Sequence, residues 1–179
     1  MTQHPSSRRT RRRSQDGFTL LETLCALGLL AVVAAGVLPL GLLATKLTEN
    51  QGHLVARTTE YSQDKLEQLL ALAYGDSTSD TRVFPATATG GTGLAVGGSV
   101  NTAAVVTGYV DYLDANGNVL ASVGNAAPAN WFYMRAWQVS TPRGNLKQVT
   151  VTAIVRAAAA GGLGGIPRSS VTALKTSPF

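Results

Sequence analysis

The chain has 179 residues, a formal net charge of +5 and one cysteine, Cys25. This length suits one domain of ordinary size, or a short anchor followed by one smaller domain. A charged fraction of 14% excludes a wholly disordered chain. A single cysteine excludes both an intramolecular disulfide framework and a metal site built from several thiolates.

The basic charge is concentrated near the N-terminus. Five arginines lie within residues 8–13, ahead of Gly17, whereas the chain from Phe18 onward has ten basic and nine acidic residues. Because nucleic-acid binding needs a basic face on a folded domain, the sequence predicts no nucleic-acid partner. Arginines directly before a long apolar segment instead favour retention of this end in the cytoplasm.

An apolar segment follows the arginines. It has no formal charge from Thr23 to Thr45, and these 23 residues would extend over about 34 Å as a helix, enough to cross a bilayer core. A cleaved secretory signal has a shorter apolar core, so we expect a membrane anchor. Cys25 should pack there as a small apolar residue. Glu22 is either solvated among lipid headgroups or functional, because a carboxylate inside a membrane is costly.

The residues at the start of this segment resemble the class III signal of type IV pilins and pseudopilins. The matching features are a basic leader, the sequence GFTLLE at residues 17–22, the apolar helix, and Pro39 at the twenty-second position after the glycine. The resemblance implies that prepilin peptidase cuts after Gly17, that the new terminus Phe18 is N-methylated, and that Glu22 aligns subunits.

The resemblance also implies partners and a location. The partners are other pilin subunits contacted through the N-terminal helix, prepilin peptidase, and the inner-membrane assembly machinery. The subunit would cross the inner membrane once before assembly and then enter a pilus or pseudopilus, with its globular part outside the cytoplasm. Pairing of the Phe18 amine with Glu22 of a neighbour would set the axial register, because an unpaired buried charge costs about 3–5 kcal/mol.

Pro39 predicts a kink or local break in the helix. Proline removes one backbone donor, and Gly36 and Gly41 flank it. A tolerated proline without a role is the alternative.

The expected organisation is a leader (1–17), an assembly helix (18–45) and an amphipathic continuation of that helix (46–74). Apolar side chains of the continuation recur at helical spacing: Leu47, Leu54, Tyr61, Leu66, Leu69, Leu70 and Ala73. Glu60 and Asp64 lie on the opposite side, where we expect them to be solvated. Gly75 predicts the helix end at residue 74.

A connection rich in Gly, Thr and Ser (75–101) leads to a predicted antiparallel sheet (102–179). The strand segments are rich in β-branched and aromatic residues and cover 103–113, 119–123, 131–141, 146–156 and about 170–175. Asn116-Gly117 predicts a hairpin, and alternation from Val149 to Val155 predicts one buried face. The expected fold is therefore α+β and type IV pilin-like, with a long N-terminal helix packed on a small antiparallel sheet.

Two binding alternatives remain open in the sheet region. Asp114, Asn116 and Asn118 alternate as calcium ligands do, but the glycine comes too early for an EF-hand loop and no glutamate closes it. The aromatic residues within 131–137 are expected to pack in the core, and a carbohydrate-binding platform is the alternative.

The sequence contains no GxSxG, P-loop, HExxH or paired-cysteine pattern, so we expect no catalysis, cofactor or metal. The strand sequences at 133–139 and 146–151 resemble PilV-type minor pilins. A minor pilin of a type IV pilus is therefore the expected function. The alternatives are a minor pseudopilin of a type II secretion system and a monomeric membrane-anchored extracytoplasmic binding module.

Overall fold

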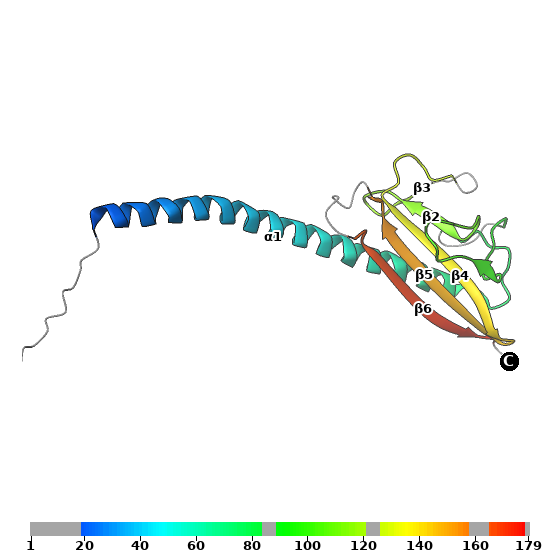
Figure 1. Ribbon diagram of the computed structural model, residues 1–179. Coiled ribbons are helices and arrows are strands. Elements are labelled where there is room, and N and C mark those ends of the chain that lie inside the picture. Colours follow the sequence, from blue (N-terminus) through cyan, green and yellow to red (C-terminus); the bar gives the residue numbers. More distant parts are fainter. Residues whose placement is uncertain (1–18, 84–88, 121–125, 158–164, 178–179) are drawn as a thin grey trace, which may run out of the picture. The chain divides into compact units, whose positions relative to one another are not determined.

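A computed structural model describes residues 19–83, 89–120, 126–157 and 165–177 (Figure 1). The chain divides into two compact units, residues 1–44 and 45–179. One α-helix contributes to both units, and a six-stranded antiparallel sheet lies in the second.

The helix α1 covers Leu20–Ala71, which joins the predicted apolar and amphipathic segments in one element. It ends three residues before the predicted end at 74. Two lysines of the sheet bind carbonyl oxygens near this end: Lys175 Nζ donates to Leu70 at 2.5 Å and Lys147 Nζ to Tyr74 at 2.6 Å. Cations beside carbonyls that a helix leaves free stabilise its C-terminus, and these two contacts lie at or just after the end of α1.

α1 is continuous through Pro39. The local break that the sequence predicts between Gly36 and Gly41 is therefore absent, and these residues are helical in the structure. A proline removes only one N–H donor, and no side chain or distant backbone crowds Gly36 or Gly41. The residues on both sides keep the helical conformation.

The sheet contains six strands, β1 Gly97–Gly98, β2 Val110–Leu113, β3 Val119–Leu120, β4 Tyr133–Arg143, β5 Leu146–Val155 and β6 Arg168–Thr176. Their spatial order is β3-β2-β4-β5-β6, and β1 also pairs with β4. All neighbouring strands are antiparallel. β6 therefore forms one edge of the sheet.

The predictions for the first two strand segments, 103–113 and 119–123, were only partly right. The segment 103–113 is a strand only from Val110, because the chain turns at Gly108, where φ is +83°. The predicted hairpin joins β2 and β3 and pairs Leu113 with Val119. Residues 121–123 of the next prediction lie outside the described residues. The last three predicted segments correspond to β4, β5 and β6.

The connection 75–101 contains the short strand β1, which the sequence did not predict. Gly98 has a φ of +80°, and a Cβ there would lie 2.2 Å from the Trp137 carbonyl oxygen. Only glycine fits this approach to β4.

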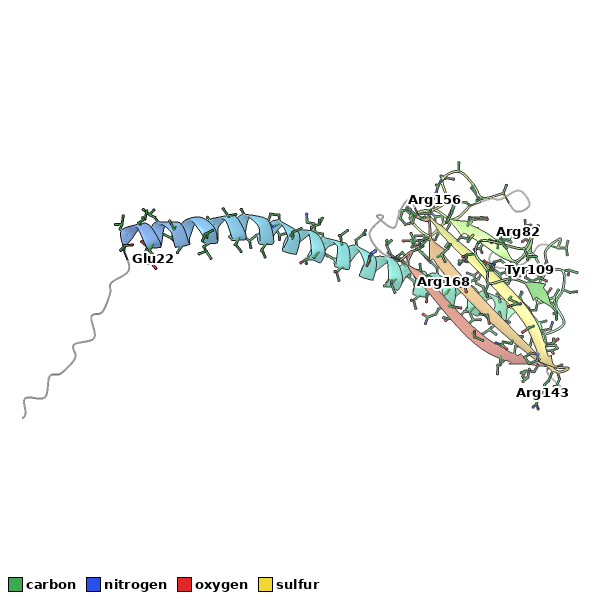
Figure 2. All side chains as sticks on the ribbon, in the orientation of Figure 1. Glu22, Arg82, Tyr109, Arg143, Arg156 and Arg168 are labelled. Carbon is green, nitrogen blue, oxygen red and sulfur yellow. The ribbon has the colours of Figure 1, made fainter. Side chains whose placement is uncertain are left out.

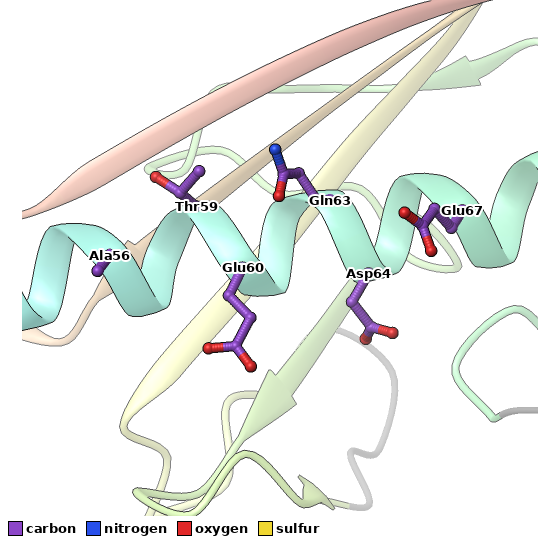
Figure 3. A pocket seen from close by; sticks show the side chains of 6 residues that line it. All are labelled: Ala56, Thr59, Glu60, Gln63, Asp64 and Glu67. Carbon is purple, nitrogen blue, oxygen red and sulfur yellow. The ribbon is translucent and has the colours of Figure 1, made fainter.

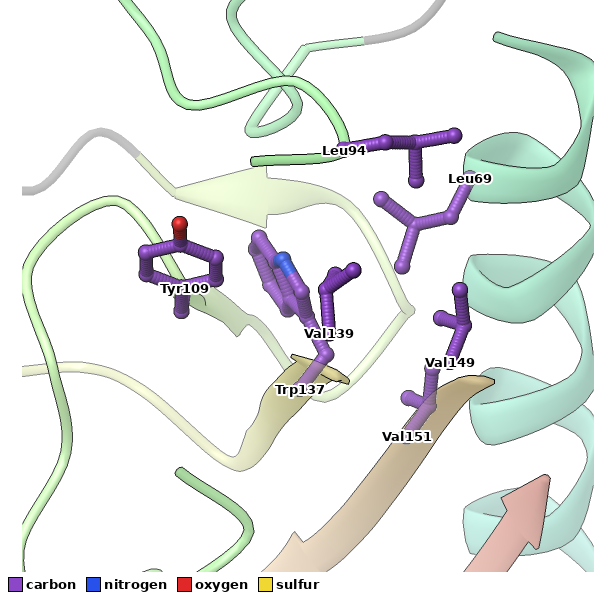
Figure 4. Close-up of a cluster of buried hydrophobic side chains, with 7 residues drawn as sticks. All are labelled: Leu69, Leu94, Tyr109, Trp137, Val139, Val149 and Val151. Atoms are coloured by element: carbon purple, nitrogen blue, oxygen red, sulfur yellow. The ribbon is translucent and has the colours of Figure 1, made fainter. Parts of the chain in front are cut away.

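The core lies between one face of the sheet and the second part of α1. One cluster joins α1, β4, β5 and the connection: Leu69, Leu94, Tyr109, Trp137, Val139, Val149 and Val151 (Figure 4). A second cluster lies toward the other end of the strands: Leu54, Tyr61, Leu113, Tyr133, Ala153 and Val155. The predicted buried face of β5 is confirmed.

Candidate membrane and assembly site

The first turn of α1 is organised by Thr19. Its carbonyl oxygen accepts hydrogen bonds from the backbone N–H groups of Glu22 and Thr23, at 3.0 and 3.2 Å, and its hydroxyl oxygen lies 3.4 Å from the Glu22 nitrogen. Thr19 and Glu22 have the spacing of a capping box. A carboxylate is also favoured near the positive end of the helix dipole. The first turn therefore accommodates Glu22 locally.

The side chains that follow are apolar and uncovered. From Leu20 to Leu43, the large apolar side chains are between 53% and 78% exposed. A helix with apolar residues on all sides needs lipid or other helices around it. Within the described part of the chain, α1 is the helix that is long and apolar enough to cross a membrane, with a mean hydropathy of 2.4 in its apolar part.

Glu22 is the only charged residue in the described part of the chain before Lys46. It lies near the start of α1 (Figure 2), and no described residue binds its carboxylate. Inside lipid or a helix bundle, such a carboxylate is costly unless a cation from another chain pairs with it.

The structure describes only some of the other residues that the sequence analysis singled out in this region. Gly17 and Phe18 lie outside the described residues, so the expected cleavage and methylation remain predictions. Pro39 lies within the helix, and Cys25 is an exposed free thiol.

A buried ion network in the second unit joins α1 to the sheet. Asp111 of β2 accepts two hydrogen bonds from Arg135 of β4, Nε to Oδ1 at 2.7 Å and Nη2 to Oδ2 at 2.8 Å. Lys65 Nζ of α1 lies 2.8 Å from Asp111 Oδ2. These three side chains are at most 2% exposed. Arg135 also reaches Asp64, which is half exposed, at 2.9 Å.

Lys65 has further partners in the core. Its ammonium group donates to the Thr81 carbonyl oxygen, and Nζ lies 4.3 Å from the centre of the Trp137 ring. The cation therefore has hydrogen-bond and aromatic contacts that offset part of its desolvation.

The charges of the network depend on one another. Burial alone would raise the pKa of Asp111, but the cations Lys65 and Arg135 hold that pKa below its ordinary value of 3.8. Burial lowers the pKa of Lys65, and Asp111 offsets part of this shift. We infer that Asp111 stays ionised at neutral pH and that the network locks α1 onto β2 and β4.

Sequence reasoning missed this network. Asp64 and Glu60 are exposed as expected, but Asp64 also pairs with Arg135. The missed signal was position: Lys65 lies four residues after Tyr61 and four before Leu69, in the apolar row that faces the core. A charge in such a row needs a partner.

The loop considered for calcium is a hydrogen-bonded turn in the structure. Asp114 Oδ1 accepts the backbone N–H groups of Asn116 and Asn118, and Oδ2 accepts the Asn118 side-chain amide. These bonds hold the pKa of Asp114 below its ordinary value. Among the described residues, no group of three or more His, Cys, Asp or Glu is placed to hold a metal.

The aromatic residues serve mainly the core. Tyr133 and Trp137 are 3% and 0% exposed, which confirms the packing interpretation for these two. Trp131 is half-buried on the other face of the sheet, with its ring centre 5.8 Å from that of Tyr112. Phe132 packs beside Tyr133.

An open pocket lies on the solvent-exposed face of α1 in the second unit, and several of its side chains are acidic. Its lining residues are Ala56, Thr59, Glu60, Gln63, Asp64 and Glu67 (Figure 3). Glu60 pairs with Arg57 at 3.0 Å, and both side chains are largely exposed. Exposed pairs of this kind contribute little to stability.

One family model matches the chain, over residues 12–38, and it describes the prokaryotic N-terminal methylation motif. The match contains Gly17, Phe18 and Glu22 and ends one residue before Pro39. No curated protein matches the chain, and no solved structure matches it. The long N-terminal helix and the antiparallel sheet form an α+β, type IV pilin-like arrangement. The match covers 27 of the 179 residues and places the methylation motif over the residues before α1 and its first part.

Proposed function

We propose that this chain is a minor pilin of a type IV pilus, of the PilV type. In this proposal prepilin peptidase removes residues 1–17, the new amino terminus of Phe18 is methylated, and the subunit assembles through α1. The role is structural and needs neither catalysis nor a cofactor.

One observation carries the proposal. The methylation motif overlaps an apolar helix surface that the described part of the chain leaves uncovered. Lipid covers such a surface before assembly, and the helices of neighbouring subunits replace lipid afterwards. In this proposal the unassembled subunit resides in the inner membrane, with its sheet outside the cytoplasm. Its apolar helix surface therefore contacts lipid first and neighbouring helices after assembly.

The pairing of charges explains how subunits would align. Cleavage creates a cationic amine at Phe18, four residues before Glu22, at the start of an apolar helix. A staggered neighbour can pair its Glu22 with this amine. Because a buried charge without its partner costs about 3–5 kcal/mol, the pairing favours one axial register. Pro39 would allow the helix to bend in the bundle, a role that we also propose.

The test is to shear surface filaments from producing cells and measure the chain in the filaments and in the membranes. A minor pilin is expected in the sheared filaments. Gly17→Leu should keep the leader and stay in the membrane, because a bulky side chain at the cut hinders cleavage. Gly144→Ala is the control, since Gly144 lies outside α1, between β4 and β5, and a Cβ there meets no atom within 4 Å.

The other outcomes identify the alternatives. A processed chain found with a secretion apparatus, and absent from surface filaments, would replace the pilus assignment with a type II pseudopilin. A chain that retains residues 1–17 and never leaves the membrane would contradict both and favour an anchored binding module.

A further inference from the structure

The outer edge of β6 is long, regular and unpaired in the described part of the chain. β6 pairs with β5 at nine successive positions, from Arg168 opposite Ile154 to Thr176 opposite Leu146, without a bulge. It contains no proline. Proteins usually protect such edges with short strands, bulges, prolines or charges, because a free edge accepts another strand.

The hydrogen-bond pattern shows which backbone groups point outward. Immediately before β6, Val155 N–H donates to Pro167 carbonyl oxygen at 3.2 Å, and immediately after it, Ser177 N–H donates to Asn145 at 2.9 Å. Bonded pairs alternate in an antiparallel ladder, so the odd-numbered residues of β6 bond to β5. The N–H and C=O groups of the even-numbered residues therefore point away from the sheet: Arg168, Ser170, Thr172, Leu174 and Thr176.

The side chains of β6 alternate between the two faces of the sheet. All five even-numbered residues are exposed, and the four odd-numbered residues between them are half-buried. Leu174 presents an apolar side chain that is 61% exposed beside the free edge. Arg168, at the start of β6 (Figure 2), makes no ion pair or side-chain hydrogen bond with a described residue.

We propose that the outer edge of β6 binds an extended strand donated by a different protein chain, with a carboxylate placed beside Arg168. Outward N–H and C=O groups at every second residue match the spacing of a β-strand and of no other common ligand. Side chains of the added strand would lie beside the hydroxyl groups of Ser170 and Thr172, which already bond to Thr152 and Thr150 at 3.0 Å.

A second copy of this chain does not fit the edge by antiparallel pairing. Thr59 binds Ser169, and Leu70 binds Lys175, so β6 runs in the same direction as this part of α1. Antiparallel pairing of two β6 edges would turn the two α1 segments in opposite directions. Subunits anchored in one membrane point the same way, a step that rests on the proposed function. The opposite sheet edge, β3, has only two residues.

The first test is residue-resolved hydrogen exchange of the full-length chain. In detergent micelles, the N–H groups of residues 170, 172, 174 and 176 should exchange fast, and those of 169, 171, 173 and 175 slowly. In envelopes of producing cells the first set should slow by about tenfold or more. Equal, fast exchange in both samples would overturn the proposal. Intact mass of the same samples reports leader removal separately, so failure of the proposed function is distinguishable.

The second test identifies the occupant by cross-linking. Thr172→Cys in a Cys25→Ser background, carrying a photoreactive label, should form an adduct with one different chain in producing cells, and Arg168→Glu should abolish that adduct. An adduct of two copies, or no adduct at all, would contradict the proposal.

Backbone and charge variants complete the design. Thr172→Pro removes one outward N–H and no backbone hydrogen bond to β5, so protection of β6 should be lost in the envelope. Thr172→Ala should keep the protection, and it is the matched control because both variants lose the side-chain bond to Thr150. Arg168→Glu should lower protection and Arg168→Lys retain it, which keeps the test decisive where Thr172→Pro fails to fold. Full protection in both Thr172→Pro and Arg168→Glu would refute the proposal.

Discussion

The two parts of α1 show how one helix serves two surroundings. Up to Leu43 its large apolar side chains are exposed, and Glu22 has no partner in the described part of the chain. From Leu54 onward one face is buried against the sheet, and Lys65 enters a complete ion network. The second part of α1 finds its packing and charge partners within the subunit, whereas the first part needs lipid or other chains around it. The same kind of buried charge therefore supports assembly in one part and folding in the other.

The largest expected effect is on assembly, through Glu22. Glu22→Leu should leave membrane insertion and the unfolding of the sheet unchanged, but lower incorporation into filaments by about a hundredfold, because the cationic amine of a neighbour loses its partner. The measurement is the ratio of subunit in sheared filaments to subunit in membranes. Glu22→Asp, which keeps the charge, should fall between wild type and Glu22→Leu. Normal incorporation of Glu22→Leu would remove the proposed role.

Loss of the carboxylate that pairs with Lys65, in the second part of α1, should affect folding instead of assembly. Asp111→Asn leaves Lys65 buried without a carboxylate and Arg135 with Asp64 alone, and should lower the free energy of unfolding by about 3–5 kcal/mol. Asp64→Asn is the matched control, because Asp64 is half exposed, and should cost about 0.2–1 kcal/mol. Denaturant unfolding of the full-length chain in micelles measures both. Equal effects of the two variants would contradict the network.

Acid should act on the same network. The folded-state pKa of Asp111 is lowered, so its stabilising contribution is complete above the unfolded value of 3.8 and is lost as the pH falls through the lower folded value. The free energy of unfolding should therefore fall below about pH 4 in wild type. Asp111→Asn should show a shallower fall. An identical acid profile in the two proteins would contradict this assignment.

The last comparison takes one leucine from each part of α1, and Leu29→Ala is the smallest change expected. Leu69→Ala should cost about 2–5 kcal/mol, because Leu69 is 1% exposed in the core. Leu29→Ala, at a site 69% exposed, should leave unfolding of the sheet almost unchanged. Denaturant midpoints of the two variants give the comparison, and a larger loss for Leu29→Ala would reverse it.

Sequence patterns predicted correctly those elements whose apolar side chains repeat at a regular spacing. The apolar segment, the rows through Leu54 and Tyr61, and the alternation from Val149 to Val155 each repeat at the spacing of a helix or a strand, and the structure confirms them. The α+β arrangement follows from these elements.

Features that depend on distant contacts were not predictable in the same way. Lys65, Asp111 and Arg135 are far apart in the chain, and no local pattern pairs them. Lys175, more than one hundred residues later in the chain, binds the Leu70 carbonyl oxygen near the end of α1, and no local pattern indicates this contact. β1 exists because Gly97 and Gly98 reach β4, so pairing rather than propensity decides it.

The most direct test of the central claim is the intact mass of the chain purified from producing cells, with fragmentation of its N-terminus. The expected chain lacks residues 1–17, begins at Phe18 and carries one methyl group on the Phe18 amine. A chain that keeps the arginines of residues 8–13 and lacks the methyl group would contradict it.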